Sequence, residues 1–129
     1  MTAKDLRHPI KVAHGLGSSR SGVGHWWMQR VTAAALIVLA VWFVLTVLGL
    51  LHADYATARA AVAQPWNALL LITFVITLFW HAVLGLQVVV EDYVHTHWRA
   101  LCLLLAIRFL AVLGALASVL AVLRIALTH

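Results

Sequence analysis

Charged residues and cysteine are both scarce in this chain. Asp, Glu, Lys and Arg make up 10% of the 129 residues, whereas 64% are hydrophobic. This composition excludes an ordinary soluble globular domain and is typical of integral membrane proteins. The single cysteine, Cys102, excludes an internal disulfide, a CxxCH haem attachment and an iron–sulfur cluster held by this chain alone. Any redox cofactor must therefore use histidine or be shared with another subunit.

Acidic residues are fewer than basic ones, and the basic residues are unevenly placed. The formal net charge is +5, and five of the nine Lys and Arg residues precede residue 31. They form no basic stripe with interleaved aromatic side chains, so we expect no nucleic-acid partner. An excess of cations before the first apolar run indicates instead that the N-terminal segment lies on the cytoplasmic side of a membrane.

Three long apolar runs dominate the rest of the chain, at residues 31–51, 66–90 and 100–123. Each can cross the hydrocarbon core of a bilayer, which takes about 20 helical residues. The sequence therefore predicts an all-α integral membrane protein. Its three transmembrane helices would form an up-down-up bundle with a cytoplasmic N-terminus. We expect one membrane-anchor domain over residues 1–129, in which residues 1–30 are a cytoplasmic tail.

The segments between these runs are short. The Gly/Ser-rich stretch "HGLGSSRSGVG" predicts an irregular end to the tail, "HADYATARAAVAQP" a short loop with the helix-breaking Pro65, and "EDYVHTHWR" a shorter loop. Neither loop is long enough to form a soluble domain. Three spans with so little soluble mass predict that the chain works with partner subunits.

His81 is the one histidine that lies deep in a predicted span. An ionisable residue at membrane depth is costly unless it is paired or bound to a ligand, so it marks a candidate functional site. Neutral imidazole is well suited to axial ligation of haem iron, and Gly85, one turn later on nearly the same face, would leave room for a flat porphyrin. The alternative is that His81 only hydrogen-bonds to a neighbouring helix. A haem with two histidine ligands would need its second ligand from another polypeptide or from a second copy of this one.

Asp92 and Tyr93 close the same run. Asp92 follows His81 by eleven residues, which closes three helical turns to within about 20° and places both on one stripe. With His95, these residues offer a phenolic hydroxyl and titratable groups, which a quinone headgroup requires. Each of them alone is equally typical of an interfacial anchor.

Two arginines lie near the predicted membrane boundaries. Arg30 follows two tryptophans at the start of the first run, where a guanidinium can pair with a carboxylate such as a haem propionate or act as a positive-inside anchor. Arg108 lies inside the third run, and we expect it to extend toward the interface or to pair within a complex.

The stretches "SGVGHWWMQRVTA" and "FWHAVLGLQVVVEDYVH" resemble the hydrophobic membrane anchor subunits of succinate dehydrogenase, the D-type anchors of respiratory complex II. The resemblance implies that His81 is an axial ligand to the iron of a b-type haem, with the other ligand from a companion cytochrome b anchor subunit. It implies that Tyr93 hydrogen-bonds ubiquinone, that Asp92 lies near that site, and that Arg30 lies near the haem propionates. His25, His95 and His97 receive no role.

The resemblance also implies a function. The chain would anchor a succinate:ubiquinone oxidoreductase with a flavoprotein and an iron–sulfur subunit, help to pass electrons from succinate to the quinone pool, and have no activity alone. Two alternatives stay open: the anchor of a quinol:fumarate reductase, and a small structural or transport protein whose histidine merely bridges helices. We expect the bacterial inner membrane as the location in preference to the mitochondrial one.

Overall fold

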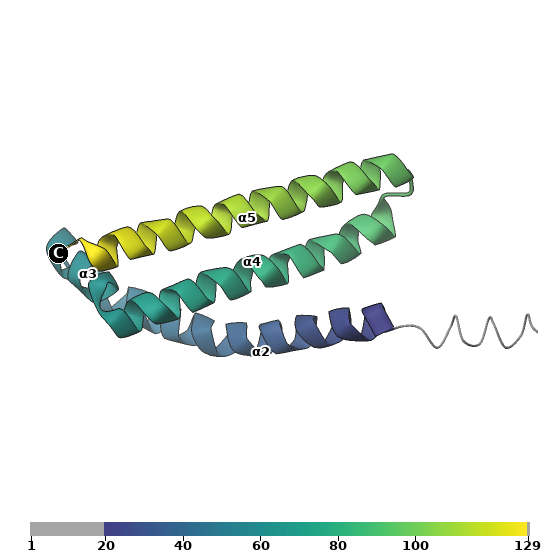
Figure 1. The fold of residues 1–129 in the computed structure, drawn as a ribbon. Helices are drawn as coiled ribbons and strands as arrows, with labels where there is room; N and C mark the ends of the chain where they lie inside the picture. The colour runs from purple at the N-terminus through teal and green to yellow at the C-terminus, as the bar shows by residue number, and fades with distance from the viewer. Residues whose placement is uncertain (1–19, 129) are drawn as a thin grey trace, which may run out of the picture.

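The computed structural model describes residues 20–128 as an all-helical protein (Figure 1). Three helices are long and a fourth is short. In chain order they are α2 (Arg20–Gly49), α3 (Tyr55–Ala63), α4 (Pro65–Tyr93) and α5 (His97–Leu127).

The three long helices are each able to span a membrane by their length and apolar composition. They comprise 30, 29 and 31 residues, or about 44–46 Å at about 1.5 Å per residue. That exceeds the hydrocarbon thickness of about 30 Å, so their ends reach the polar headgroup region or the helices tilt. The predicted all-α class with three spans is confirmed. Successive long helices run in opposite directions, as expected of an up-down-up chain.

Helix α4 is the middle helix of the molecule. Both α2 and α5 pack along it, while α2 and α5 make no comparable contact with each other, as Figure 1 shows. The described chain is therefore closer to a single layer of helices than to a closed bundle. Few of its residues are buried: Thr32, Leu39, Ala68 and Val90. Most large apolar side chains face outward, where lipid or other subunits can cover them.

The segment predicted as the first loop contains a helix, α3, so that prediction is wrong. Asp54 caps its N-terminus, with the side-chain Oδ1 accepting a hydrogen bond of 2.9 Å from the Thr57 N–H. Hydrogen bonding from Thr57, first from its side chain and then from its backbone N–H, lowers the pKa of Asp54 below 3.8. The alanine-rich sequence "YATARAAVA" has a high helix propensity, and Pro65 then takes a first-turn position of α4.

The helices also extend further into the polar segments than the sequence suggested. Residues 20–24 are helical rather than irregular, and the predicted loop 91–99 shrinks to residues 94–96. Near a membrane, a helix that continues satisfies its own backbone hydrogen bonds, which favours extension over an irregular chain. The expectation of an irregular stretch concerns residues 14–24, and residues 14–19 lie outside the described part.

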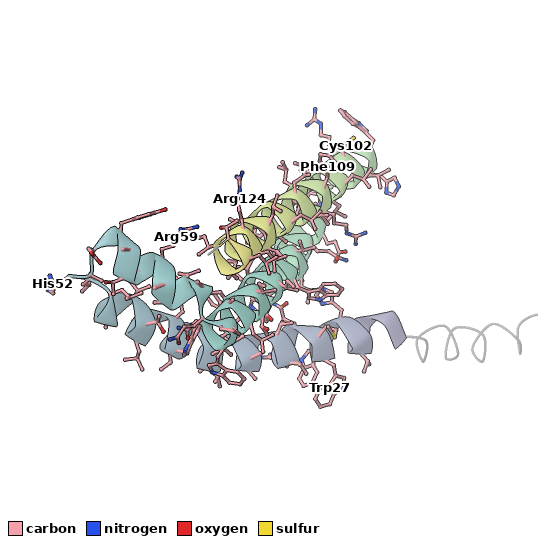
Figure 2. All side chains as sticks on the ribbon, turned by 60° about the vertical axis from the view of Figure 1, so that its left-hand side comes forward. Trp27, His52, Arg59, Cys102, Phe109 and Arg124 are labelled. Atoms are coloured by element: carbon pink, nitrogen blue, oxygen red, sulfur yellow. The ribbon has the colours of Figure 1, made fainter. Side chains whose placement is uncertain are left out.

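Hydrogen bonds from α3 and from the start of α4 stabilise the end of the molecule opposite Tyr93. The Arg59 guanidinium donates to the carbonyl oxygen and the hydroxyl of Thr128 at 2.9 and 3.0 Å, and Figure 2 shows Arg59 projecting beside the end of α5. The Asn67 amide donates to the Ala61 carbonyl at 2.8 Å. These bonds hold the end opposite Tyr93, so the two ends of the layer differ in structure.

Candidate functional site

His81 lies well inside α4. It precedes Tyr93, the last residue of the helix, by twelve positions, or about 18 Å along the axis. The ring is partly buried. His81 therefore lies far from both ends of a long uninterrupted helix that is able to span a membrane.

A hydrogen bond joins His81 to helix α2. The His81 Nδ1 lies 2.9 Å from the hydroxyl oxygen of Thr32. Thr32 is buried, at 7% exposure, and its hydroxyl oxygen also lies 2.7 Å from the Met28 carbonyl oxygen. His81 thus bridges two helices through one of its ring nitrogens.

The second ring nitrogen of His81 is differently placed. Within residues 20–128, the His81 Nε2 has no hydrogen-bond partner. The residue as a whole is partly buried. An imidazole held by Nδ1 and open at Nε2 is the usual arrangement of a histidine metal ligand.

Two further polar side chains lie on the same face of α2. His25 and Gln29 precede Thr32 by seven and three residues, close to two helical turns and one. The His25 Nε2 and Gln29 Oε1 atoms are buried and have no hydrogen-bond partner in the described chain. A Cβ at Gly85 would lie 3.8 Å from the Gln29 Nε2, so Gly85 faces α2 and the room it leaves adjoins the Gln29 amide. The contact between α2 and α4, called the seam below, is thus polar from His81 toward the end of α4 at Tyr93.

The other predicted residues lie apart from His81. Asp92 and Tyr93 are exposed at the end of α4, Tyr93 to 79%. The Arg30 guanidinium lies over the Trp26 ring, 5.4 Å from its centroid. The structure brings none of the three into contact with the histidine. Their assignments to quinone and to a haem propionate therefore stay predictions.

Arg108 takes part in a polar chain between α5 and α4. Its Nη2 donates to the Gln87 Oε1 at 3.3 Å, and the Gln87 Nε2 donates to the Glu91 Oε1 at 2.9 Å. The predicted pairing of Arg108 therefore occurs inside this chain. Next to it, an apolar groove of about 440 Å³ runs between α4 and α5, lined among others by Phe79, Val83 and Ala111.

Sequence reasoning missed Thr32 and the polar face that it completes. A polar set at positions 25, 29 and 32 has helical spacing and was visible in the sequence. Its pairing with His81 was not, because it depends on the register of α2 against α4. Cys102 is exposed at the start of α5, and Trp27 is directed away from the other helices (Figure 2).

Within residues 20–128, no three His, Cys, Asp or Glu side chains gather closely enough to hold a metal ion. A single histidine, His81, could instead hold the iron of a haem, because the porphyrin would supply other ligands. The buried His25 Nε2 and Gln29 Oε1 atoms, which have no partner in the described chain, could also hydrogen-bond to a polar group from outside the chain. The residues present therefore fit a haem held at the surface of this layer.

These features define a class of protein: a three-span membrane protein with a histidine far from the ends of its second span. The chain belongs to the succinate dehydrogenase/fumarate reductase transmembrane subunit family, whose model matches residues 4–115. It is accordingly a membrane anchor subunit of that family and a multi-pass membrane protein with bacterial homologues.

Named relatives agree with this membership. The succinate dehydrogenase hydrophobic membrane anchor subunit of Rickettsia bellii is 34% identical over 92% of this chain and 94% of its own length. The subunit of the same name from Paracoccus denitrificans is 32% identical over 78% of each chain. The succinate dehydrogenase membrane anchor subunit of Reclinomonas americana is 30% identical over 73% of this chain and 81% of its own. No solved structure matches significantly.

Proposed function

We propose that this chain anchors a succinate:ubiquinone oxidoreductase, binds a b-type haem through His81, and contributes Tyr93 and Asp92 to a ubiquinone site. The complex also contains a companion cytochrome b anchor, an iron–sulfur subunit and a flavoprotein. The family description covers fumarate reductases too, but the relatives described above are named as subunits of succinate dehydrogenase. The succinate-oxidising direction is therefore favoured over quinol:fumarate reduction.

The position of the His81 ring is the single observation that carries the haem assignment. Nδ1 is held by Thr32 at 2.9 Å, whereas Nε2 has no hydrogen-bond partner within residues 20–128. His81 could therefore bind a haem iron through Nε2, and a neighbouring subunit could supply a second histidine. When bound, the haem supplies a one-electron carrier at membrane depth. Arg30 lies in the first half of α2, at the same end of the molecule as Tyr93, and is available to pair with a haem propionate.

The end of α4 supports the quinone assignment. The Tyr93 side chain is 79% exposed and Asp92 beside it is exposed, so both are free to meet a quinone or a partner surface. The tyrosine hydroxyl can donate a hydrogen bond to a quinone carbonyl oxygen, and the aspartate can hold a proton nearby. Quinone reduction consumes protons, so titratable groups at this point serve the reaction.

The charge distribution supports a cytoplasmic position for this end. Of the six arginines in residues 20–128, all but Arg59 and Arg124 belong to the half of the layer that contains Tyr93. The positive-inside tendency then places Tyr93 on the cytoplasmic face, which in a bacterial inner membrane is where a soluble dehydrogenase would dock.

A second function is favoured by one observation. His81 does bridge α4 to α2 through Thr32, as a purely structural histidine would. The two roles are compatible because imidazole has two nitrogens. A purely structural role predicts a colourless protein that co-purifies with no flavoprotein.

The complex purified through a tag on this chain tests the proposal. We expect flavin, iron–sulfur and reduced-minus-oxidised b-type haem spectra. His81→Ala should remove the haem spectrum, and His52→Ala, an exposed histidine at the opposite end, should not. Unchanged haem content in His81→Ala would show that another residue binds the iron.

The quinone site needs a separate measurement. Tyr93→Phe should slow electron transfer to ubiquinone while leaving succinate oxidation by artificial acceptors intact, because those acceptors take electrons before the quinone site. Tyr55→Phe is the matched control, since Tyr55 is equally exposed but lies on α3. Wild-type quinone kinetics in Tyr93→Phe would exclude the tyrosine as a quinone ligand.

A further inference from the structure

Thr32 differs from the other threonines of the long helices in what its hydroxyl contacts. Thr46, Thr73 and Thr77 each donate a hydrogen bond to the carbonyl four residues earlier. Thr32 does the same toward Met28 at 2.7 Å, but its oxygen also lies 2.9 Å from the Nδ1 of His81 on another helix. It is buried, at 7% exposure.

The direction of these bonds follows from donor counting. A hydroxyl has one hydrogen and two acceptor lone pairs, whereas a carbonyl oxygen can only accept. The Thr32 hydrogen therefore points to the Met28 carbonyl, with the Gln29 carbonyl at 3.2 Å sharing it. With the hydroxyl hydrogen directed to Met28, the Thr32 oxygen accepts from the His81 Nδ1–H, which is the tautomer that a ligand at Nε2 requires. The lone pair of that ring is on Nε2.

We infer that Thr32 is a positioning residue for the iron ligand: its hydroxyl fixes the Nδ1–H tautomer and the ring orientation of His81, and it adjusts the electron donation of Nε2. This inference rests on the proposed haem function. Thr32 does not touch the iron and acts through His81. A hydrogen bond from Nδ1–H to an acceptor raises the basicity of the ligating nitrogen and limits rotation of the ring.

The buried position makes Thr32 an effective acceptor. The Thr32 hydroxyl donates to the backbone carbonyl of Met28 in the same helix, α2. This bond fixes the hydroxyl, so its acceptor lone pair is directed toward α4. Little water reaches this oxygen because the residue is 7% exposed. If Thr32 is lost, the His81 Nδ1–H loses its hydrogen-bond partner in the described chain. The ring is then free to rotate, and its donor strength falls.

The test uses the assembled complex with Thr32→Val, which keeps the shape and removes the hydroxyl. We expect haem transfer to apomyoglobin to become about 10-fold faster or more, in line with the usual effect of losing such a partner. The haem midpoint potential should rise, because a weaker donor stabilises ferric iron less. The electron paramagnetic resonance g-values should also change with the ring orientation. Thr32→Ser should restore all three properties.

Two further variants complete the design. Thr46→Val removes a hydroxyl that bonds only within α2 and should behave as wild type. Thr32→Cys, with a weaker acceptor of similar size, should give an intermediate shift and serves if Thr32→Val fails to assemble. A wild-type potential and g-values in whichever of these two Thr32 variants assembles would overturn the inference. If His81→Ala retains the haem, the proposed function fails instead, so the two failures are distinguishable.

Discussion

The polar chain from Arg108 through Gln87 to Glu91 allows a quantitative prediction about an arginine inside a membrane span. Arg108 follows His97, the first residue of α5, by eleven positions, or about 16 Å. The helix exceeds the hydrocarbon thickness by about 16 Å, so about 8 Å projects on each side if it is centred. The Arg108 backbone then lies about 8 Å inside the hydrocarbon boundary, a distance that its long side chain covers in large part.

The expected energy of the Arg108–Gln87 contact is therefore small. Hydrogen bonds between membrane helices average about 0.6 kcal/mol and reach about 1.7 kcal/mol. The contact of 3.3 Å is long and both side chains reach the surface of the described chain, which argues for the lower half of that range. The charge on Arg108 and the second bond from Gln87 to Glu91 at 2.9 Å argue against a value of zero. We expect a coupling of about 0.6–1 kcal/mol.

A double-mutant cycle measures this coupling. Wild type, Gln87→Leu, Arg108→Leu and the double variant would be compared in the assembled complex by unfolding in mixed micelles with increasing dodecyl sulfate. Gln87→Leu alone should destabilise, because it leaves the arginine without its partner, and this loss should be smaller by the coupling energy in the Arg108→Leu background, where only the bond from Gln87 to Glu91 is lost. Gln87→Leu with Arg124→Leu is the control pair, since Arg124 lies in the last turn of α5 and the two effects should add. Additivity in the Arg108 cycle as well would refute the reasoning.

Two other substitutions test the packing and the cap. Gly114→Leu should destabilise the α4–α5 contact by about 1–3 kcal/mol through overpacking, because even a Cβ there would lie 2.8 Å from the Phe79 ring. A Cβ at Gly49 would meet nothing within 4 Å, so Gly49→Leu should leave the melting temperature unchanged. Equal melting temperatures of the two variants would contradict this. Asp54→Ala should loosen α3 at neutral pH, seen as faster amide hydrogen exchange. Because contacts with Thr57 lower the pKa of Asp54, the cap is complete above the ordinary value of 3.8 and weakens as the pH falls through the lowered pKa. In the wild type, amide hydrogen exchange in α3 should therefore become faster only in acid. Exchange protection that does not change with pH would contradict the capping role of Asp54.

Much of the candidate site was predictable because it depends on positions along one helix. His81 and Asp92 belong to one apolar run, and their spacing alone places them on one stripe about three turns apart. The depth of His81 follows from the length of the same run. These inferences need only the regular geometry of an α-helix, which the absence of water in a bilayer enforces.

The wrong predictions concern polar segments that form helices. The segment before Pro65 was predicted as a loop from its polar residues and its proline, yet the alanine-rich stretch after Asp54 forms α3. Capping by Asp54 and the favourable propensity of alanine outweigh the breaking effect of a proline that comes only after the helix has ended. The proline itself begins the next helix.

The sequence by itself determined the membrane class, the three spans and the position of His81 deep within its span, because hydropathy and helical periodicity are local properties of the chain. Only the tertiary structure decided that α4 is the middle helix, that Thr32 holds the Nδ1 of His81, and that Arg108 finds Gln87. These contacts depend on the axial register of neighbouring helices. That register is set by many weak packing contacts between helices, which no single stretch of the sequence contains.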